Sequence, residues 1–450
     1  MQENSTLKKG KGQVHLFRCA NEFLALDVNS DTLIEISAEA YDILEQVNRD
    51  GELSLDEIPQ TSLEDFNELI TLYQEEALYS PPLEYSAEYP PHLQGMCLLI
   101  DGRCNLVCSY CFVRNRTTSR HLSAMNFEKA RGAIDFLLQN SPYEEVEVDF
   151  FGGEPLLNFP VLQDIVNYGN KRTLEAGRKI NFTLTTNAML LTSPIQEFLI
   201  DNQIETVLSL DGSQDTNDLY RVDSQGKGSY NTVSQNIKEY LSKNPPPFYV
   251  RGTYTSQTLH FADSARYLFN EGFPVVSIEP VVGKKHNFAL KEDDLSEVFQ
   301  QYELLSQWYL EEKLKGRDIT FFHFLLDPLR GPDLKRRTGG CGAGRDYLAI
   351  SPEGDIYPCH QFVGEINFIL GNLSEGLKNI ELRSRFISLD FSTKDKCLQC
   401  WARFYCSGGC HANHYFANGS IYQPDDFECA LLKKRLEWAL WIKAKLKQSE

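Results

Sequence analysis

Three cysteines lie in one short segment and have the spacing of ligands to a metal centre. They are Cys104, Cys108 and Cys111, in the order C-x3-C-x2-C, directly after an apolar run at 96–100. Three cysteines cannot all pair as disulfides, whereas thiolates are good soft ligands. A [4Fe-4S] cluster normally takes four cysteines, so these three would leave one iron open. A structural zinc site is the alternative, and it would need a fourth ligand such as His121.

A second field of cysteines occupies the C-terminal part of the chain. Its first two members are separated by twelve residues, a glycine (Gly354) and four residues, and its last member stands alone after a gap. Tight local groups of cysteines favour metal centres over disulfides, and C-x2-C can also begin a zinc ribbon. The members are Cys341, Cys359, Cys397, Cys400, Cys406, Cys410 and Cys429.

Composition indicates an ordinary globular protein. The chain has 450 residues, 42% of them hydrophobic, which predicts two to four domains with ample core. It has no long uncharged apolar run and no secretory leader, so we expect a cytoplasmic protein without a membrane partner. The net charge of −19 argues against a nucleic-acid partner, because phosphate-binding surfaces carry a basic stripe.

Strand-like and helix-like segments alternate from about 93 to 320. Six strands are predicted at 96–100, 146–151, 180–186, 206–210, 249–254 and 275–279, and six helices at 127–138, 161–174, 195–200, 230–241, 261–269 and 295–314. Alternation of this kind predicts an α/β fold with a parallel sheet and right-handed crossovers. The chemistry of such barrels lies at the carboxyl ends of the strands.

Polar residues and glycines stand at those strand ends. The first strand leads into the three-cysteine segment, and the second leads into a G-G-E-P sequence whose glycines permit close backbone approach. Each of the polar residues can also cap a helix or satisfy a loop. The candidates at the ends of the second to fifth strands are Gly152, Gly153, Glu154, Asn187, Ser209 and Arg251.

The N-terminal segment predicts a small separate module at 1–80. Short strands are expected at 14–17, 23–28 and 32–36, and a helix capped by Ser37 follows them. A second helix is expected from Thr61, which forms a capping-box pattern with Glu64. Strands followed by helices in this order suggest a winged-helix-like module, and the proline-rich stretch 81–92 reads as its linker.

The three-cysteine segment together with the G-G-E-P sequence resembles the radical SAM enzymes. The resemblance implies an open partial (β/α)6 barrel at 93–320 and a [4Fe-4S] cluster on Cys104, Cys108 and Cys111, whose open iron binds S-adenosylmethionine (SAM). It implies that Tyr110 lies beside the adenine and that Gly152, Gly153 and Glu154 hold the methionine amino group. By position, Asn187, Ser209 and Arg251 resemble the family's contacts to the ribose and the carboxylate.

The C-terminal field resembles the seven-cysteine signature of the SPASM domain, an extension of radical SAM enzymes that modify peptides and proteins. We assign it to 321–450, with a C-terminal helix. The resemblance implies two auxiliary [4Fe-4S] clusters, and hence three in the whole chain. Cys397, Cys400, Cys406 and Cys429 would hold the second auxiliary cluster, and Cys341, Cys359 and Cys410 the first.

The first auxiliary cluster would lack one protein thiolate, because no cysteine lies between Gly342 and Pro358. An open iron can bind a substrate thiolate and lower its pKa. Alternatively, Cys19, Cys97, a carboxylate or His360 fills the position. Three further residues of the SPASM segment are expected either to touch substrate or to pack: Tyr405, His411 and His414.

An open auxiliary cluster and a leader-binding N-terminal module resemble the maturases that form thioether cross-links in ribosomal peptides. In these enzymes a 5′-deoxyadenosyl radical removes a hydrogen from carbon, and a cysteine bound to the auxiliary cluster then forms the C–S bond. The resemblance implies a precursor peptide whose leader adds a strand to the N-terminal module, and an electron donor such as flavodoxin or ferredoxin. The alternatives are sulfatase-type oxidation to formylglycine, carbon-carbon cross-linking, a non-catalytic metal-dependent recognition protein and a winged-helix regulator.

Overall fold

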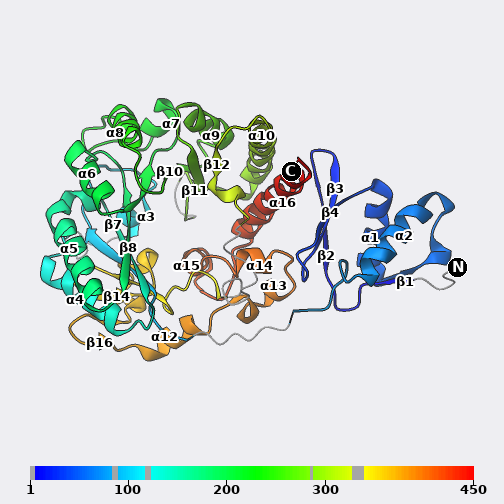
Figure 1. Cartoon of the computed structure of the whole chain (residues 1–450), viewed down its shortest axis with the longest axis horizontal. Coiled ribbons are helices and arrows are strands. Elements are labelled where there is room, and N and C mark those ends of the chain that lie inside the picture. The colour runs from blue at the N-terminus through cyan, green and yellow to red at the C-terminus, as the bar shows by residue number, and fades with distance from the viewer. Residues whose placement is uncertain (1–5, 84–89, 117–122, 284–286, 327–338, 450) are drawn as a thin grey trace.

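Figure 1 shows a small N-terminal module, a large α/β unit and a long C-terminal helix between them. The structure is a computed structural model, and it describes residues 6–83, 90–116, 123–283, 287–326 and 339–449. Within those residues, no helix is long and apolar enough to cross a membrane.

The N-terminal module contains two small antiparallel sheets and two helices. Strands β2 (Val14–Cys19), β3 (Glu22–Asp27) and β4 (Leu33–Ile36) form one sheet, and β1 (Thr6–Lys8) pairs with β5 (Glu52–Ser54). Helix α1 (Ala38–Asp50) is capped by Ser37 as predicted, since the Ser37 side chain accepts a hydrogen bond from the Ala40 amide. Helix α2 spans Leu63–Gln74. The prediction that Thr61 begins this helix is wrong, because Thr61 lies in a preceding 3-10 turn.

The two faces of the β2–β3–β4 sheet pack against different parts of the protein. Ala25 belongs to the core of the N-terminal module, whereas its neighbours Leu24 and Leu26 belong to the main core. This follows from the alternation of side chains along a strand. The strand and helix order agrees with the prediction, and the winged-helix assignment stays a prediction.

All six predicted strands of the α/β unit are present, and neighbouring strands pair in parallel. They are β6 (Gly95–Asp101), β7 (Glu145–Gly152), β8 (Lys179–Thr186), β9 (Glu205–Ser209), β10 (Phe248–Tyr254) and β11 (Val275–Pro280). The helices between and after them are α3 (Phe112–Arg116), α4 (Phe127–Gln139), α5 (Phe159–Glu175), α6 (Ser193–Asp201), α7 (Gln214–Asp218), α8 (Tyr230–Ser242), α9 (Phe261–Asn270) and α10 (Leu295–Leu314).

The sheet continues beyond these six strands at both edges. Strand β12 (Thr320–Phe321) joins β11, and β13 (Tyr347–Ile350) joins β6 in parallel. Three short antiparallel strands follow: β14 (Asp355–Tyr357), β15 (Gly371–Asn372) and β16 (Gly376–Leu377). The sheet therefore runs across the predicted boundary at residue 320, and the domain boundaries remain predictions.

The C-terminal segment is helical. It contains α12 (Ile380–Ile387), α13 (Asp395–Leu398), α14 (Arg403–Cys406), α15 (His411–Asn418) and the predicted C-terminal helix α16 (Asp426–Ser449). Helix α16 packs along α10 and also contacts β2 and β4, so it joins the barrel to the N-terminal module (Figure 1).

Strand β6 is buried on both faces because it lies in the middle of the sheet. Met96, Leu98 and Ile100 pack in the main core, whereas Cys97 and Leu99 pack in a second core with residues of the C-terminal segment. Burial on both faces explains why its sequence is apolar throughout.

Candidate functional site

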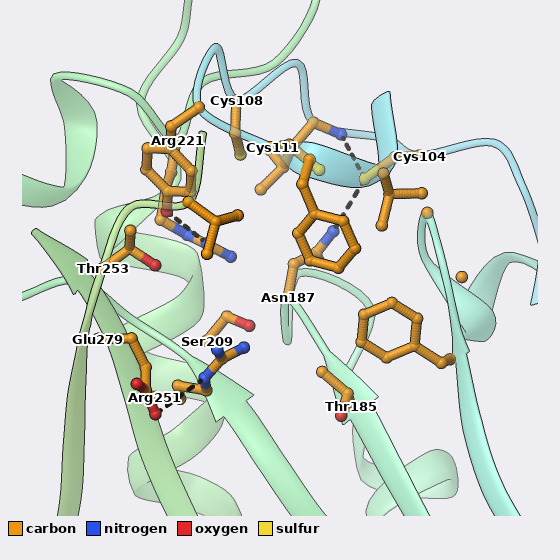
Figure 2. A pocket seen from close by; sticks show the side chains of 18 of the residues that line it. Cys104, Cys108, Cys111, Thr185, Asn187, Ser209, Arg221, Arg251, Thr253 and Glu279 are labelled. Carbon is orange, nitrogen blue, oxygen red and sulfur yellow. Dashed lines mark hydrogen bonds and ion pairs between the residues drawn. The ribbon is translucent and has the colours of Figure 1, made fainter. Parts of the chain in front are cut away.

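A cavity opens at the carboxyl ends of the parallel strands, and the three-cysteine loop forms part of its wall (Figure 2). Most of the predicted SAM contacts line this cavity together. The predicted residues in its wall are Cys104, Cys108, Cys111, Tyr110, Gly152, Gly153, Asn187, Ser209 and Arg251. The rest of the wall includes Phe112, Phe151, Glu279, His360 and Gln361.

Asp101, at the end of β6, fixes the start of the cysteine loop. Its carboxylate is fully buried and accepts bonds from the Arg103 side chain, Nε to Oδ1 at 2.9 Å and Nη2 to Oδ2 at 2.6 Å. The backbone of Gly153 donates to the Asp101 carbonyl at 2.8 Å. A side chain on Gly152 or Gly153 would collide with this segment, because an added Cβ would lie 2.3 Å from the carbonyl oxygen of Asp101 or Arg103. Both glycines are thus required for close packing of the two loops.

Glu154 lies beneath the cavity and does not line it. Its carboxylate is fully buried and accepts hydrogen bonds from the Asn187 amide at 2.8 Å, the Thr186 hydroxyl at 2.7 Å and the Leu156 amide at 3.0 Å. Burial raises the pKa of Glu154, although these three bonds oppose the shift. In this structure Glu154 holds the β7 and β8 loops together, so its predicted contact to SAM stays a prediction.

Asn187 is directed at the cysteine loop. Its side-chain amide donates to Asn105 Oδ1 at 2.7 Å and to Cys104 Sγ at 3.5 Å (Figure 2). The end of β8 is thereby tied to the first cysteine of the loop.

Arg221 is a buried cation that the sequence analysis missed. Its Nη1 donates to the Tyr110 hydroxyl at 2.9 Å, and that hydroxyl donates to Asp211 Oδ2 at 2.6 Å. Arg221 also lines the cavity (Figure 2). Nothing in its sequence neighbourhood distinguishes it from a surface arginine, since its partners are about ten and one hundred residues away.

A second charged group lies across the cavity from the cysteine loop. Glu279 Oε1 is 3.0 Å from His323 Nε2 and 3.8 Å from Arg251 Nε, and the Ser277 hydroxyl donates to it at 3.2 Å. Burial alone would raise the pKa of Glu279, but His323 and Arg251 lower it well below its usual range. Glu279 is therefore an ionised carboxylate in the cavity wall, and the sequence analysis missed it too.

The thiols fall into three groups in space. Desolvation and the charges of Cys108 and Cys111 raise the pKa of Cys104, although this residue is still exposed to solvent. Burial and the charges of Cys410 and Cys341 raise the pKa of Cys359. Burial and the charges of Cys397 and Cys400 raise the pKa of Cys406. The pKa of Cys429 is raised by burial and by the charges of Cys406 and Cys400. The grouping is consistent with the division into three, three and four that the resemblance implied, and the binding of a cluster by each group stays a prediction.

The donor chemistry of these groups fits iron-sulfur clusters. Clustered thiols are costly as anions without a metal, so each group favours a bound cation. In the part of the chain that is described, no three His, Cys, Asp or Glu side chains converge as they would on a single ion. A cluster spreads its ligands further apart, because each thiolate binds a different iron. His121, the possible zinc ligand, lies outside the described residues.

The structure separates the alternatives for the open position of the first auxiliary cluster. Cys19 lies far from the three thiols, among Lys434, Glu437 and Glu303. Cys97 packs in the same core as Cys359 and Cys410 and interacts with Cys359. Its thiol also bonds with Tyr347. Cys97 therefore remains an alternative, whereas Cys19 does not.

His360 lies in the cavity wall beside two aromatic residues. It follows Cys359 in the chain, and its ring lies 4.8 Å from Phe151 and 6.0 Å from Phe112. The next residue, Gln361, donates to Cys410 Sγ at 3.4 Å. His411 and His414 are buried, and the Tyr405 hydroxyl bonds to Asp31 in the N-terminal module.

Comparison with known protein families agrees with this arrangement. A family model described as a 4Fe-4S single cluster domain matches residues 95–235, and one for the SPASM iron-sulfur cluster-binding domain matches residues 341–401. The fold and the thiol groups thus define a radical SAM protein with a SPASM domain.

Individual relatives place the chain more closely. It is 26% identical over 358 residues to the cysteine-type anaerobic sulfatase-maturating enzyme of Clostridium perfringens, which covers 75% of this chain and 93% of that enzyme. It is 23% identical over 358 residues to the radical SAM cyclopropyl synthase TigE of Paramaledivibacter caminithermalis, covering 76% of this chain and 72% of the synthase. The crystal structure of Streptococcus suis SuiB bound to precursor peptide SuiA has a similar fold, with a TM-score of 0.53, 17% identity and 92% and 98% of the two chains covered. The chain belongs to the radical SAM/SPASM peptide maturases.

Proposed function

We propose that this peptide maturase forms thioether cross-links in a ribosomally made precursor peptide, joining a cysteine sulfur to a carbon. The observation that carries the proposal is the cavity itself. Its wall includes both the three-cysteine loop and the residues His360 and Gln361. His360 directly follows Cys359, and Gln361 donates to Cys410 Sγ at 3.4 Å; both cysteines belong to the group that offers only three thiols.

The proposal assigns three [4Fe-4S] clusters to the three thiol groups and SAM to the cavity. Bound SAM and its cluster supply a 5′-deoxyadenosyl radical, and the first auxiliary cluster supplies an iron for a substrate thiolate. The chain's own residues position these groups. Gly152 and Gly153 offer backbone at short range, and Asn187 and Ser209 offer polar side chains from the ends of β8 and β9.

Charged and aromatic residues both line the cavity. Arg221 and Arg251 supply positive charge for a carboxylate, each with an acidic neighbour that limits its movement. Phe112 and Phe151 stack 6.2 Å apart between the cysteine loop and His360. Apolar rings here exclude water from the path between the two centres, which protects a reactive carbon radical from side reactions.

The length of the chain supports a precursor peptide, and not a sulfatase, as the substrate. The sulfatase-maturating relative is matched over 93% of its length, yet a quarter of this chain remains outside that match. SuiB, which was solved with a precursor peptide, matches 92% of this chain. The N-terminal module, predicted at 1–80, is smaller than this unmatched quarter, and we propose that it binds the peptide leader. A small electron-transfer protein such as flavodoxin or ferredoxin would reduce the SAM cluster.

The test is co-expression with a small cysteine-rich peptide encoded beside this gene, followed by mass spectrometry. A thioether removes two hydrogens per cross-link and leaves the cysteine unable to react with an alkylating reagent. Conversion of cysteine to an aldehyde, or a cross-link that leaves the cysteine free to be alkylated, would contradict the proposal.

Iron content gives a second measurement. Reconstituted protein should hold about twelve irons per chain, and the triple variant C104A/C108A/C111A about eight, at four per cluster. SAM cleavage should be lost in that variant. The matched control is Cys19→Ala, which removes a buried thiol outside all three groups and should keep both the iron and the activity.

A further inference from the structure

Lys394 is a buried cation that the proposed reaction does not use. It directly precedes α13, and only 1% of its surface is exposed. Its Nζ donates to the Gly408 carbonyl at 2.6 Å and lies 3.2 Å from His411 Nδ1 and 3.3 Å from His414 Nδ1. A buried lysine is rare unless its charge is compensated nearby.

Three acceptors lie within hydrogen-bond distance of Lys394 Nζ. An ammonium group has three N–H donors, and three acceptors are in place. The acceptors are the Gly408 carbonyl oxygen and the Nδ1 atoms of His411 and His414.

Burial lowers the pKa of Lys394, and the charges of four nearby cysteines oppose this shift. They are Cys397 and Cys406 from the group of four, and Cys341 and Cys410 from the group of three. Gly408, which accepts the shortest of its hydrogen bonds, lies between Cys406 and Cys410 in the chain. Lys394 therefore stands between the two auxiliary groups and interacts with two thiols of each.

We propose that Lys394 is a positioning residue shared by both auxiliary clusters, whose negative charge its ammonium partly offsets. This inference rests on the clusters assigned above. A fixed positive charge in a poorly solvated site favours the reduced, more negative form of a nearby cluster. Charge and hydrogen bonds around a cluster set its reduction potential. Lys394 therefore raises the reduction potentials of both clusters and makes them better acceptors of the electron that C–S bond formation releases.

The test is potentiometric titration of the reconstituted full chain, followed by electron paramagnetic resonance. Lys394→Met removes the charge and keeps a similar unbranched side chain. We expect both auxiliary signals to move to more negative potential, while the signal of the SAM cluster stays in place. The matched control is Lys396→Met, because Lys396 is two residues away but exposed, and it pairs with Asp426 at 2.7 Å.

Each outcome decides the inference. Unchanged auxiliary potentials in iron-replete K394M overturn it, as does a shift of the same size in K396M. If K394M loses iron, Lys394→Arg keeps the charge and should retain both clusters at potentials close to those of the wild type. Loss of the clusters in K394R as well would show that Lys394 acts by shape and not by charge. Wild-type protein without auxiliary clusters would instead refute the proposed function.

Discussion

Arg221 holds together the part of the cavity wall that begins at Tyr110. Its guanidinium is buried beside the Tyr110 hydroxyl, and the charges of Cys108 and Asp211 favour its ionised form. Asp211 is itself buried and accepts a hydrogen bond from the Thr253 amide at 3.0 Å. One side chain thus links the cysteine loop with the ends of β9 and β10.

Replacing Arg221 by methionine should destabilise this wall. Removing one partner of a buried charged pair costs about 3–5 kcal/mol, because the other charge is left uncompensated. We expect a lower denaturant midpoint and a SAM cleavage rate at least about tenfold lower, as the Tyr110 loop loses its anchor. Chemical denaturation and a cleavage assay with chemical reductant check this.

Arg266→Met is the matched control for this change. Arg266 forms a surface pair with Asp263 at 2.7 Å, and such pairs contribute about 0–1 kcal/mol. Equal effects of the two substitutions would show that Arg221 has no special role.

Site residues that belong to a motif of fixed spacing could be predicted from the sequence. Single buried charged residues of the site could not. The spacing of the cysteines and the G-G-E-P sequence pointed to the cavity wall, and its glycines meet the backbone of 101–103 as close approach requires. Arg221, Glu279 and Lys394 gave no signal, because each depends on partners distant in the chain or on burial. The sequence also did not show that Glu154 lies under the cavity.

At the scale of elements, α16 carries the contact between the barrel and the N-terminal module. Trp438 is 2% exposed and packs edge-on against Trp441, whose Nε1 donates to Glu22 in β3 at 2.6 Å. Lys445 pairs with both Glu22 and Glu35, in β3 and β4. The sequence predicted a C-terminal helix, but not the surface on which it would lie.

Trp438→Ala should destabilise the folded protein by about 3–5 kcal/mol, the usual cost of truncating a buried aromatic side chain. Denaturant unfolding followed by circular dichroism measures the change. Lys447→Ala, on an exposed position of the same helix, should change the midpoint little. A Trp438→Ala variant as stable as the Lys447→Ala variant would mean that α16 does not support the core.

The contact between α16 and β2 should depend on pH. Burial alone would raise the pKa of Glu437, but the hydrogen bond from His15 at 3.2 Å and the charge of Lys434 lower it. A carboxyl with a lowered pKa in the folded state stabilises that state above its ordinary pKa of 4.5, and the contribution is lost as the pH falls through the lowered value.

Glu437→Gln should therefore be less stable than the wild type at pH 7, and the difference should shrink as the pH falls below 4.5. Thermal unfolding of both proteins at several pH values checks the sign. A difference that grows in acid would contradict the assignment.

At the scale of the whole molecule, the N-terminal sheet lies against the segment that carries the second auxiliary group. His15 in β2 stacks on Trp401 with ring centroids 3.9 Å apart, and Gln13 donates to the Gln399 carbonyl at 3.0 Å. Arg403 reaches back to Asn29 at 3.0 Å. A leader bound to this module would thus be held at a fixed position relative to the cavity.

Strand β4 is the edge that we expect to receive the leader, because α16 contacts both edge strands, whereas β2 also packs against Trp401 through His15. Among the described strands, β4 pairs with β3 alone. The Asp27 amide donates to the Thr32 carbonyl at 2.8 Å, and hydrogen-bonded pairs alternate along an antiparallel ladder. The amides of Leu33 and Glu35 therefore face outward, where an added strand would bind them.

Leu33→Pro should remove one of these outward donors while the ladder to β3 stays intact. We expect the affinity for a precursor with its leader to fall at least about tenfold, or 1.4 kcal/mol. Affinity for the leaderless core peptide and cleavage of SAM should not change, because the cavity lies in the barrel. Fluorescence anisotropy with labelled peptides measures the two affinities. Leu33→Ala controls for the lost side chain, and an unchanged precursor affinity in Leu33→Pro would exclude β4 as the leader-binding edge.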